Sequence, residues 1–203
     1  YEQGADELIY QDTVASLYQR NSLIDIITKT AKDIFIPITV GGGIRSLDDI
    51  KTVLRAGADK VSINTAAIQS PKFISEASSI FGSSTIVVAI EAIKQPDNSY
   101  LAYTDNGREY TGVDVLSWAK NIEELGAGEI LLTAIDQEGT GSGFDFSLIK
   151  MISDVVKIPI ICHGGASKTS HIVDAIKNSN TDAVAISSMI HYSVLKNNDQ
   201  IFS

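Results

Sequence analysis

Two glycine clusters in the sequence have the pattern of a pair of phosphate-binding sites. Gly41–Gly43 is followed by the polar pair Asn64–Thr65, and Gly164–Gly165 is followed by Ser187–Ser188. Glycine allows backbone N–H groups to approach a phosphate closely, and hydroxyl and amide side chains donate to its oxygens. One cluster alone would indicate no more than a turn between a strand and a helix. Two clusters with polar partners predict a substrate with a phosphate at each end.

A carboxyl group between these clusters is the best candidate for acid–base chemistry. Glu91 follows the apolar run Ile86–Ile90. A carboxyl group at the mouth of such a strand is partly removed from water, which raises its pKa toward the range useful for proton transfer. A plain surface position or an ion pair with Lys94 would also explain Glu91. Asp12 and Asp136, which we relate by an internal repeat, stand at other strand ends, where capping a loop is the ordinary role.

Three further features have candidate roles. Glu138–Gly143 is a glycine-rich segment that we expect to form a flexible loop able to close over a phosphate. His163 directly precedes a glycine cluster and is placed to touch a ligand. Glu7, Lys60 and Glu129 stand at the starts of predicted strands, where a structural ring of salt bridges is the ordinary role.

The elements that must position these residues alternate along the chain. Continuous apolar strands that alternate with amphipathic helices predict a parallel sheet covered by helices. The predicted strands are Glu7–Thr13, Ile36–Val40, Lys60–Ile63, Thr85–Ile90, Glu129–Thr133, Ile158–Cys162 and Ala183–Ile186. The predicted helices are Leu23–Lys32, Leu47–Ala56, Pro71–Phe81, Val113–Leu125, Ser147–Val156 and Thr169–Asn178. Turn residues on both sides of Tyr100–Thr104 predict a β-excursion within Lys94–Glu109.

An internal repeat indicates the architecture. Ile36–Ile38 matches Ile158–Ile160 at a spacing of 122 residues, and Asp59–Thr65 matches Asp182–Ser188 at 123. The strand at Thr85–Ile90 is the one predicted strand without a mate. We therefore expect an α/β fold, a (βα)₈ TIM barrel built of two (βα)₄ half-barrels, in a single domain over residues 1–203. We also expect the first strand and its loop, and a piece near the C-terminus, to be absent from this sequence.

Composition excludes several classes of function. The chain has 25 acidic and 16 basic residues and a net charge of −9, which argues against a nucleic-acid groove. No apolar run approaches the roughly 20 residues of a membrane helix. The single cysteine, Cys162, cannot form an internal disulfide, and we expect a cytoplasmic location. No Cys/His group has the spacing of a zinc site, and we expect neither a metal nor a cofactor.

Four segments together resemble the cyclase subunit of imidazole glycerol phosphate synthase. They are Ala5–Leu8, Val40–Arg45, Gly57–Ala67 and Gly126–Thr133. The resemblance extends from about Gly4 to His191. It implies an enzyme that takes ammonia from a glutaminase partner in a heterodimer. This ammonia is used to split the phosphoribulosyl-formimino derivative of aminoimidazole carboxamide ribonucleotide into imidazole glycerol phosphate and aminoimidazole carboxamide ribonucleotide.

The resemblance also implies roles for residues. The family uses two aspartates as general acid and base, one on the first strand and the other matching Glu91. The implied phosphate contacts are Gly43, Asn64 and Thr65 at one end and Gly139, Thr140, Gly164, Gly165, Ser187 and Ser188 at the other. We count as further active-site residues Asp12, Thr133, Asp136 and His163. The charged ring at the ammonia entrance maps to Glu7, Lys60 and Glu129, with Asp59 near the glutaminase contact.

The sequence departs from this family at three positions of the site. Glu91 and Glu138 each replace an aspartate, and His163 replaces a small residue. One extra methylene moves a carboxylate by about an ångström, and misplacement on that scale costs ~100-fold in rate. The segments Asp12–Asn21 and Glu91–Ala92 are more similar to a paralogous group of bacterial surface-polysaccharide pathways, which supplies ammonia for amidation of a sugar. Three hypotheses follow: the histidine-pathway cyclase, this paralogue, and a non-catalytic barrel that docks a glutaminase.

Overall fold

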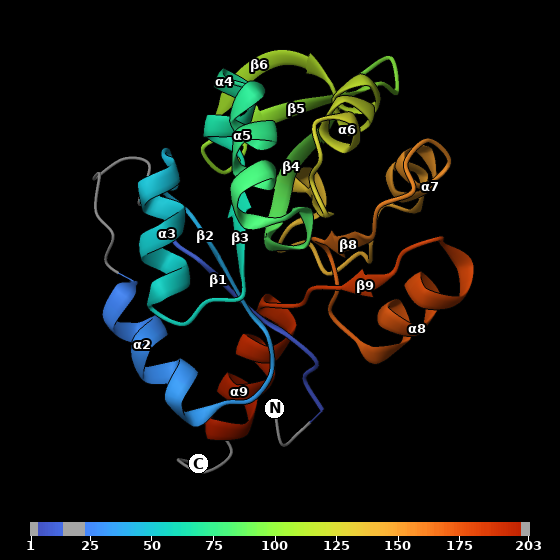
Figure 1. Cartoon of the computed structure of the whole chain (residues 1–203). Helices are drawn as coiled ribbons and strands as arrows, with labels where there is room; N and C mark the ends of the chain where they lie inside the picture. The colour runs from blue at the N-terminus through green and yellow to red at the C-terminus, as the bar shows by residue number, and fades with distance from the viewer. Residues whose placement is uncertain (1–3, 14–22, 200–203) are drawn as a thin grey trace.

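The computed structural model describes residues 4–13 and 23–199, in which helices surround a curled sheet (Figure 1). The strands are β1 (Leu8–Gln11), β2 (Ile38–Gly41), β3 (Lys60–Ile63), β4 (Ile86–Lys94), β5 (Tyr100–Thr104), β6 (Glu109–Asp114), β7 (Glu129–Ala134), β8 (Ile160–His163) and β9 (Ala183–Val184). The helices are α2 (Ile24–Asp33), α3 (Leu47–Arg55), α4 (Thr65–Gln69), α5 (Lys72–Phe81), α6 (Val115–Glu124), α7 (Phe146–Ser153), α8 (Thr169–Asn178) and α9 (Ser188–Asp199). Two 3₁₀ turns, η1 (Ser83–Thr85) and η2 (Ile135–Gln137), complete the elements.

The sheet confirms the predicted fold class. Its parallel strands follow the order β1-β2-β3-β4-β7-β8-β9, which is their order along the chain. Among the described residues, β1 pairs only with β2 and β9 only with β8, so the sheet is a partial (βα)₈ barrel. Strand β5 lies in the predicted excursion and pairs antiparallel to β4, and β6, which follows it, pairs antiparallel to β5.

Each half-barrel has the same pair of hydrogen bonds between two neighbouring strands. The Asp59 carboxylate accepts a hydrogen bond from the Ile38 N–H at 2.8 Å, and the Asp182 carboxylate accepts one from the Ile160 N–H at 2.9 Å. The Asp59 and Asp182 N–H groups donate back to the carbonyls of the same two residues. This reciprocal pair aligns the start of one strand with the start of the next. It is the structural counterpart of the sequence repeat.

The structure differs from the sequence prediction in several details, and it adds α4, β6 and α9, which were not predicted. β4 does not end at Ile90 but continues to Lys94, because its last four residues pair with β5. Helix α6 begins at Val115 and not at Val113, since β6 occupies the residues before it and Asp114 caps the helix by accepting from the Ser117 N–H at 2.8 Å. The last strand, β9, is shorter than expected.

Alternation along β4 divides the core in two. Ile86, Val88 and Ile90 belong to the large cluster between sheet and helices, whereas Val87 and Ala89 belong to a small separate cluster with Leu131 and Ile161. Side chains of a strand point alternately to opposite faces. Glu91 therefore continues the row of Val87 and Ala89, on the inner face of the curled sheet.

Gly42 is required by the close approach of β2 to the end of β1. It has a φ of +92°, and a Cβ there would collide with the Asp12 carbonyl oxygen. Gly82 has a similar φ of +88° but open space around its Cα. We expect Gly42→Ala to lower the free energy of unfolding by about 2 kcal/mol more than Gly82→Ala, since both carry backbone strain but only one carries a clash. Urea denaturation measures this difference, and equal losses would contradict the close packing.

Candidate active site

Three cavities lie in a row along the carboxyl ends of the parallel strands. The first has a volume of about 410 Å³, and its lining includes Gly42, Gly43, Asn64, Thr65 and Glu91. The second, also of about 410 Å³, is lined among others by Glu91, Thr133, His163 and Ser187. The third, of about 110 Å³, is lined by residues that include Gly139, His163, Gly164, Gly165, Ser187 and Ser188. Shared residues join each cavity to the next, so the row connects the two glycine clusters with Glu91 between them.

Burial and hydrogen bonding act in opposite directions on Glu91. Its carboxylate accepts a hydrogen bond from the Gly107 N–H at 2.8 Å. Burial raises the pKa of Glu91, and hydrogen bonds from Gly107, Asn64 and Asn106 offset part of this rise. The pKa direction agrees with the sequence prediction. The alternative ion pair is not formed within the described residues, because the Lys94 ammonium lies over the Tyr100 ring, 5.9 Å from its centroid.

The first glycine cluster faces the end of β3. Gly42 and Gly43 both adopt positive φ values, +92° and +71°. The Asn64 side-chain amide donates to the Tyr103 carbonyl oxygen at 3.2 Å, while its own oxygen is buried and lacks a partner within the described part of the chain. A buried oxygen without a partner is costly and is available to a donor on a ligand. The assignment of Gly43, Asn64 and Thr65 to a phosphate stays a prediction.

The second glycine cluster is fixed by the neighbouring loop. A Cβ on Gly164 would lie 2.6 Å from the Ala134 carbonyl oxygen, and one on Gly165 would collide with the Gly143 carbonyl oxygen. The Gly143 N–H donates to the Gly165 carbonyl at 2.8 Å. Gly139 borders the third cavity with open space around its Cα. The Glu138–Gly143 loop is therefore packed against the glycine cluster at Gly143 and has free space around Gly139.

Two residues predicted for the site lie apart from the cavities. The Thr140 hydroxyl donates to the Gln137 carbonyl at 2.8 Å and accepts from the Ser142 N–H, so it stabilises its own loop and is not among the cavity-lining residues. Asp136 is exposed in η2 and lines none of the three cavities. Asp12 and Asp136 follow the equivalent positions Gln11 and Thr133 at distances that differ by two residues, and their relation stays a prediction.

The remaining candidates line the cavities. Asp12 borders the first cavity. The Thr133 hydroxyl lies 3.3 Å from His163 Nδ1, and both residues border the second cavity. Burial lowers the pKa of His163, and the charge of Glu138 offsets part of the effect. Sequence reasoning missed Asn106, which borders the first and second cavities. Its Asp-Asn-Gly turn signature was visible, but its approach to Glu91 was not.

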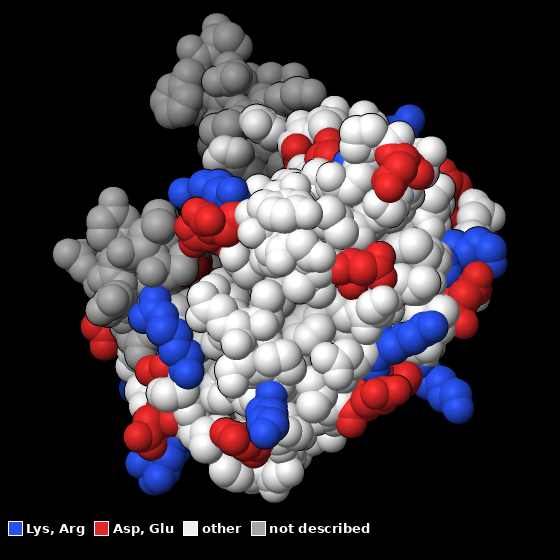
Figure 2. Space-filling view, turned by 90° about the horizontal axis from the view of Figure 1, so that it is seen from above, with Lys and Arg blue, Asp and Glu red and all other residues white. Residues whose placement is uncertain are grey.

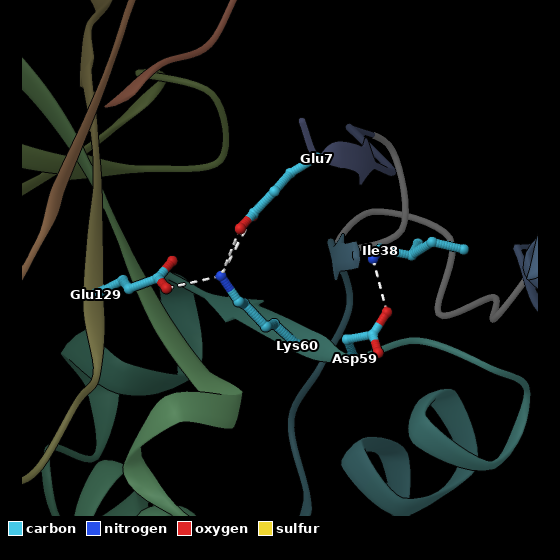
Figure 3. Close-up of polar contacts among 5 residues, drawn as sticks. All are labelled: Glu7, Ile38, Asp59, Lys60 and Glu129. Atoms are coloured by element: carbon cyan, nitrogen blue, oxygen red, sulfur yellow. Dashed lines mark hydrogen bonds and ion pairs between the residues drawn. The ribbon is translucent and has the colours of Figure 1, made fainter. Parts of the chain in front are cut away.

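A second polar cluster lies at the opposite ends of the strands (Figure 3). The Lys60 ammonium lies 3.0 Å from a Glu7 carboxylate oxygen and 2.7 Å from one of Glu129. Burial alone would lower the pKa of Lys60, but hydrogen bonds and charge from Glu129 and Glu7 together raise it. Lys60 thus remains an ammonium group between two carboxylates. Its neighbour Asp59 is engaged with the Ile38 N–H.

The surface charge is mixed on the face seen in Figure 2. Lysine, arginine and acidic residues are interspersed there around a broad uncharged area, with no continuous basic patch of the kind a nucleic-acid site needs. In the residues that the structure describes, every helix is too short or too polar to span a bilayer.

Known proteins match most of the chain. The family described as "Histidine biosynthesis protein" matches residues 1–196. Imidazole glycerol phosphate synthase subunit HisF of Legionella pneumophila is 59% identical over 83% of this chain and 79% of its own length. The HisF subunit of Methanococcus vannielii is 45% identical over 94% of this chain and 78% of its own length. That of Methanocaldococcus jannaschii is 46% identical over 94% and 77%.

The raised pKa of Glu91 predicts a pH-dependent cost to stability. In the folded protein the ionised carboxylate is disfavoured, so its cost is present above the folded-state pKa and vanishes as the pH falls toward the ordinary value of 4.5. We expect Glu91→Gln to raise Tm by a few degrees at pH 8 and by less at pH 5. Thermal denaturation at both pH values measures this. Glu76→Gln, at an exposed position on α5 beside the first cavity, is the control. A pH-independent effect at Glu91 would contradict the argument.

Proposed function

We propose that this chain is the cyclase subunit of imidazole glycerol phosphate synthase. The chain belongs to the histidine biosynthesis protein family and, within it, to the imidazole glycerol phosphate synthase subunits HisF. The observation that carries the proposal is the row of cavities, with one partly buried carboxyl group between two glycine clusters. A row of this kind suits a substrate that has a phosphate at each end and its reacting atoms in the middle.

Each part of the row has a task in this reaction. The cluster at Gly42–Gly43 with Asn64–Thr65 holds one phosphate of the phosphoribulosyl substrate, and the cluster at Gly164–Gly165 with Ser187–Ser188 holds the other. Glu91 gives or takes a proton between them, since its raised pKa keeps a larger protonated fraction than an exposed carboxyl group has. Thr133 and His163 line the same cavity and lie beside the reacting part of the substrate.

A HisH-like glutaminase supplies the ammonia in this proposal. It docks on the face that carries Glu7, Lys60 and Glu129, at the ends of the strands opposite the cavities. Asp59 lies next to Lys60 on this face, near the expected contact. We place the complex in the cytoplasm, where the single buried thiol of Cys162 stays reduced.

The surface-polysaccharide paralogue is the second candidate, and Glu91 is the observation that favours it. A glutamate carries its carboxylate about one carbon–carbon bond further than the aspartate expected of the histidine enzyme. This displacement changes which atom of a substrate the carboxyl group reaches. The paralogue would still bind a glutaminase and a phosphorylated ligand. A barrel that only docks a glutaminase is the third candidate.

Turnover of the phosphoribulosyl substrate with excess ammonium salt tests the proposal on the complete protein. We expect the wild type to form imidazole glycerol phosphate and Glu91→Gln to lose at least ~100-fold of this activity, because it has no group to transfer the proton. Asp97→Asn, at an exposed turn remote from the cavities, is the control. Turnover by Glu91→Asp but not by wild type would instead favour the paralogue.

Charge reversal at Lys60 tests the proposed ammonia entrance. Lys60→Glu would place three carboxylates together, and we expect glutamine-dependent activity in the glutaminase complex to fall by about tenfold or more. Activity with free ammonium should remain within about twofold, since ammonium salt bypasses the partner. Lys150→Glu reverses an exposed charge that also pairs with an acid, Asp154, and should change neither activity. Equal loss with both nitrogen sources would contradict the assignment.

A further inference from the structure

We infer that the β5–β6 turn, residues 105–107, is the positioning element of Glu91, and that Asn106 is the residue which fastens it over the site. The turn orients the carboxyl group through a backbone donor, and Asn106 holds the turn against the segment that follows β1. The expected effect of the turn on catalysis rests on the proposed function, whereas its effect on the position of the Glu91 carboxyl group does not.

The turn is held from three sides. The Gly107 N–H donates to Glu91 Oε2 at 2.8 Å. The Asn106 side-chain amide donates to the Thr13 carbonyl oxygen at 2.8 Å, across 93 residues of sequence. The Gly107 Cα also lies against the loop after β7, where an added Cβ would be 2.6 Å from Ile135 Cγ2. The turn thus joins the ends of β1, β4 and β7, which are not all neighbours in the sheet.

The backbone of the turn is specialised for this placement. Asp105, Asn106 and Gly107 have φ values of +59°, +60° and +76°. Hairpin turns often use left-handed residues, and Asp, Asn and Gly tolerate this conformation best. In this turn the run directs the Gly107 N–H to the carboxylate.

The turn also forms a wall of the site. Asn106 borders both large cavities, as Glu91 does, and Asp105 borders the first. At the root of the hairpin, Asn64 donates to the Tyr103 carbonyl and ties β5 to the end of β3. The turn therefore contributes both to the burial of Glu91 and to its hydrogen bonding. A glutamate side chain has three rotatable bonds, so a fixed donor is needed to select one position of its carboxyl group.

Loosening the turn acts on the pKa of Glu91 in two ways. It admits water to the carboxyl group, which lowers the pKa, and it removes the Gly107 donor, which raises the pKa, so we expect the pKa to leave its wild-type value. Asp105 also raises this pKa by its charge. The other ionisable groups that line the two large cavities are Tyr10, Asp12, Arg45, Glu76, Glu138 and His163.

The test is Asn106→Gly, with Asn98→Gly as its matched control. Both asparagines are left-handed turn residues, with φ values of +60° and +67°, but Asn98 is exposed in the β4–β5 turn, remote from the cavities. Glycine accepts this conformation and removes only the side chain.

Two readouts on the full chain decide the matter. Carboxyl ¹³C NMR, with the Glu91 signal identified by its loss in Glu91→Gln, should show a shifted titration midpoint in Asn106→Gly and not in Asn98→Gly. With ammonium as nitrogen source, kcat should fall about tenfold in Asn106→Gly while KM stays within about twofold. An unchanged titration in Asn106→Gly would overturn the inference. Absence of wild-type turnover would count against the proposed function alone, because the NMR titration needs no substrate.

Discussion

The two-residue alternation of strand β4 is the constraint on which the site depends. β4 lies at the centre of the sheet and pairs with β3 and β7, so its rotation about its own axis is fixed on both edges. Ile86, Val88 and Ile90 must then face the helices, and the intervening positions must face inward. Glu91 falls on the inward set. A shift of the register by one residue would turn the carboxyl group into the helical layer, among the apolar side chains of the large cluster.

A carboxyl group buried at that position lowers the stability of the fold, and a hydrogen bond from the β5–β6 hairpin offsets part of this loss. A buried carboxylate without donors would be strongly disfavoured. Backbone N–H groups of a turn supply donors without adding a positive charge, so they orient Glu91 and leave its pKa raised. A lysine at the same distance would have stabilised the charged form and removed the proton needed for catalysis at neutral pH. The preference for a backbone donor is therefore consistent with acid–base chemistry.

Local patterns of the sequence predicted most of the fold, whereas contacts between distant segments were missed. β-Branched runs located the parallel strands, and the repeat located the two glycine clusters at equivalent strand ends. β4 was predicted too short because its extension depends on β5, which supplies its partner from a later segment. The relation of Asp136 to Asp12 stays a prediction, because both residues lie beyond the paired positions of β1 and β7. The role of Asn106 depends on Thr13, 93 residues away, and no local pattern could indicate that contact.

The two ends of the strands divide the work of the proposed enzyme. Glu129 and Thr133 are the first and fifth residues of β7, which separates the charged cluster from the cavities by about 13 Å at 3.3 Å per residue. Between these levels the inner face carries the apolar side chains of Val87, Ala89, Leu131 and Ile161, and strand alternation adds the buried hydroxyls of Thr39 and Ser62. Neutral ammonia crosses such largely apolar surroundings at far lower cost than ammonium does. In the proposed function, ammonia would therefore travel uncharged from the Lys60 cluster to Glu91.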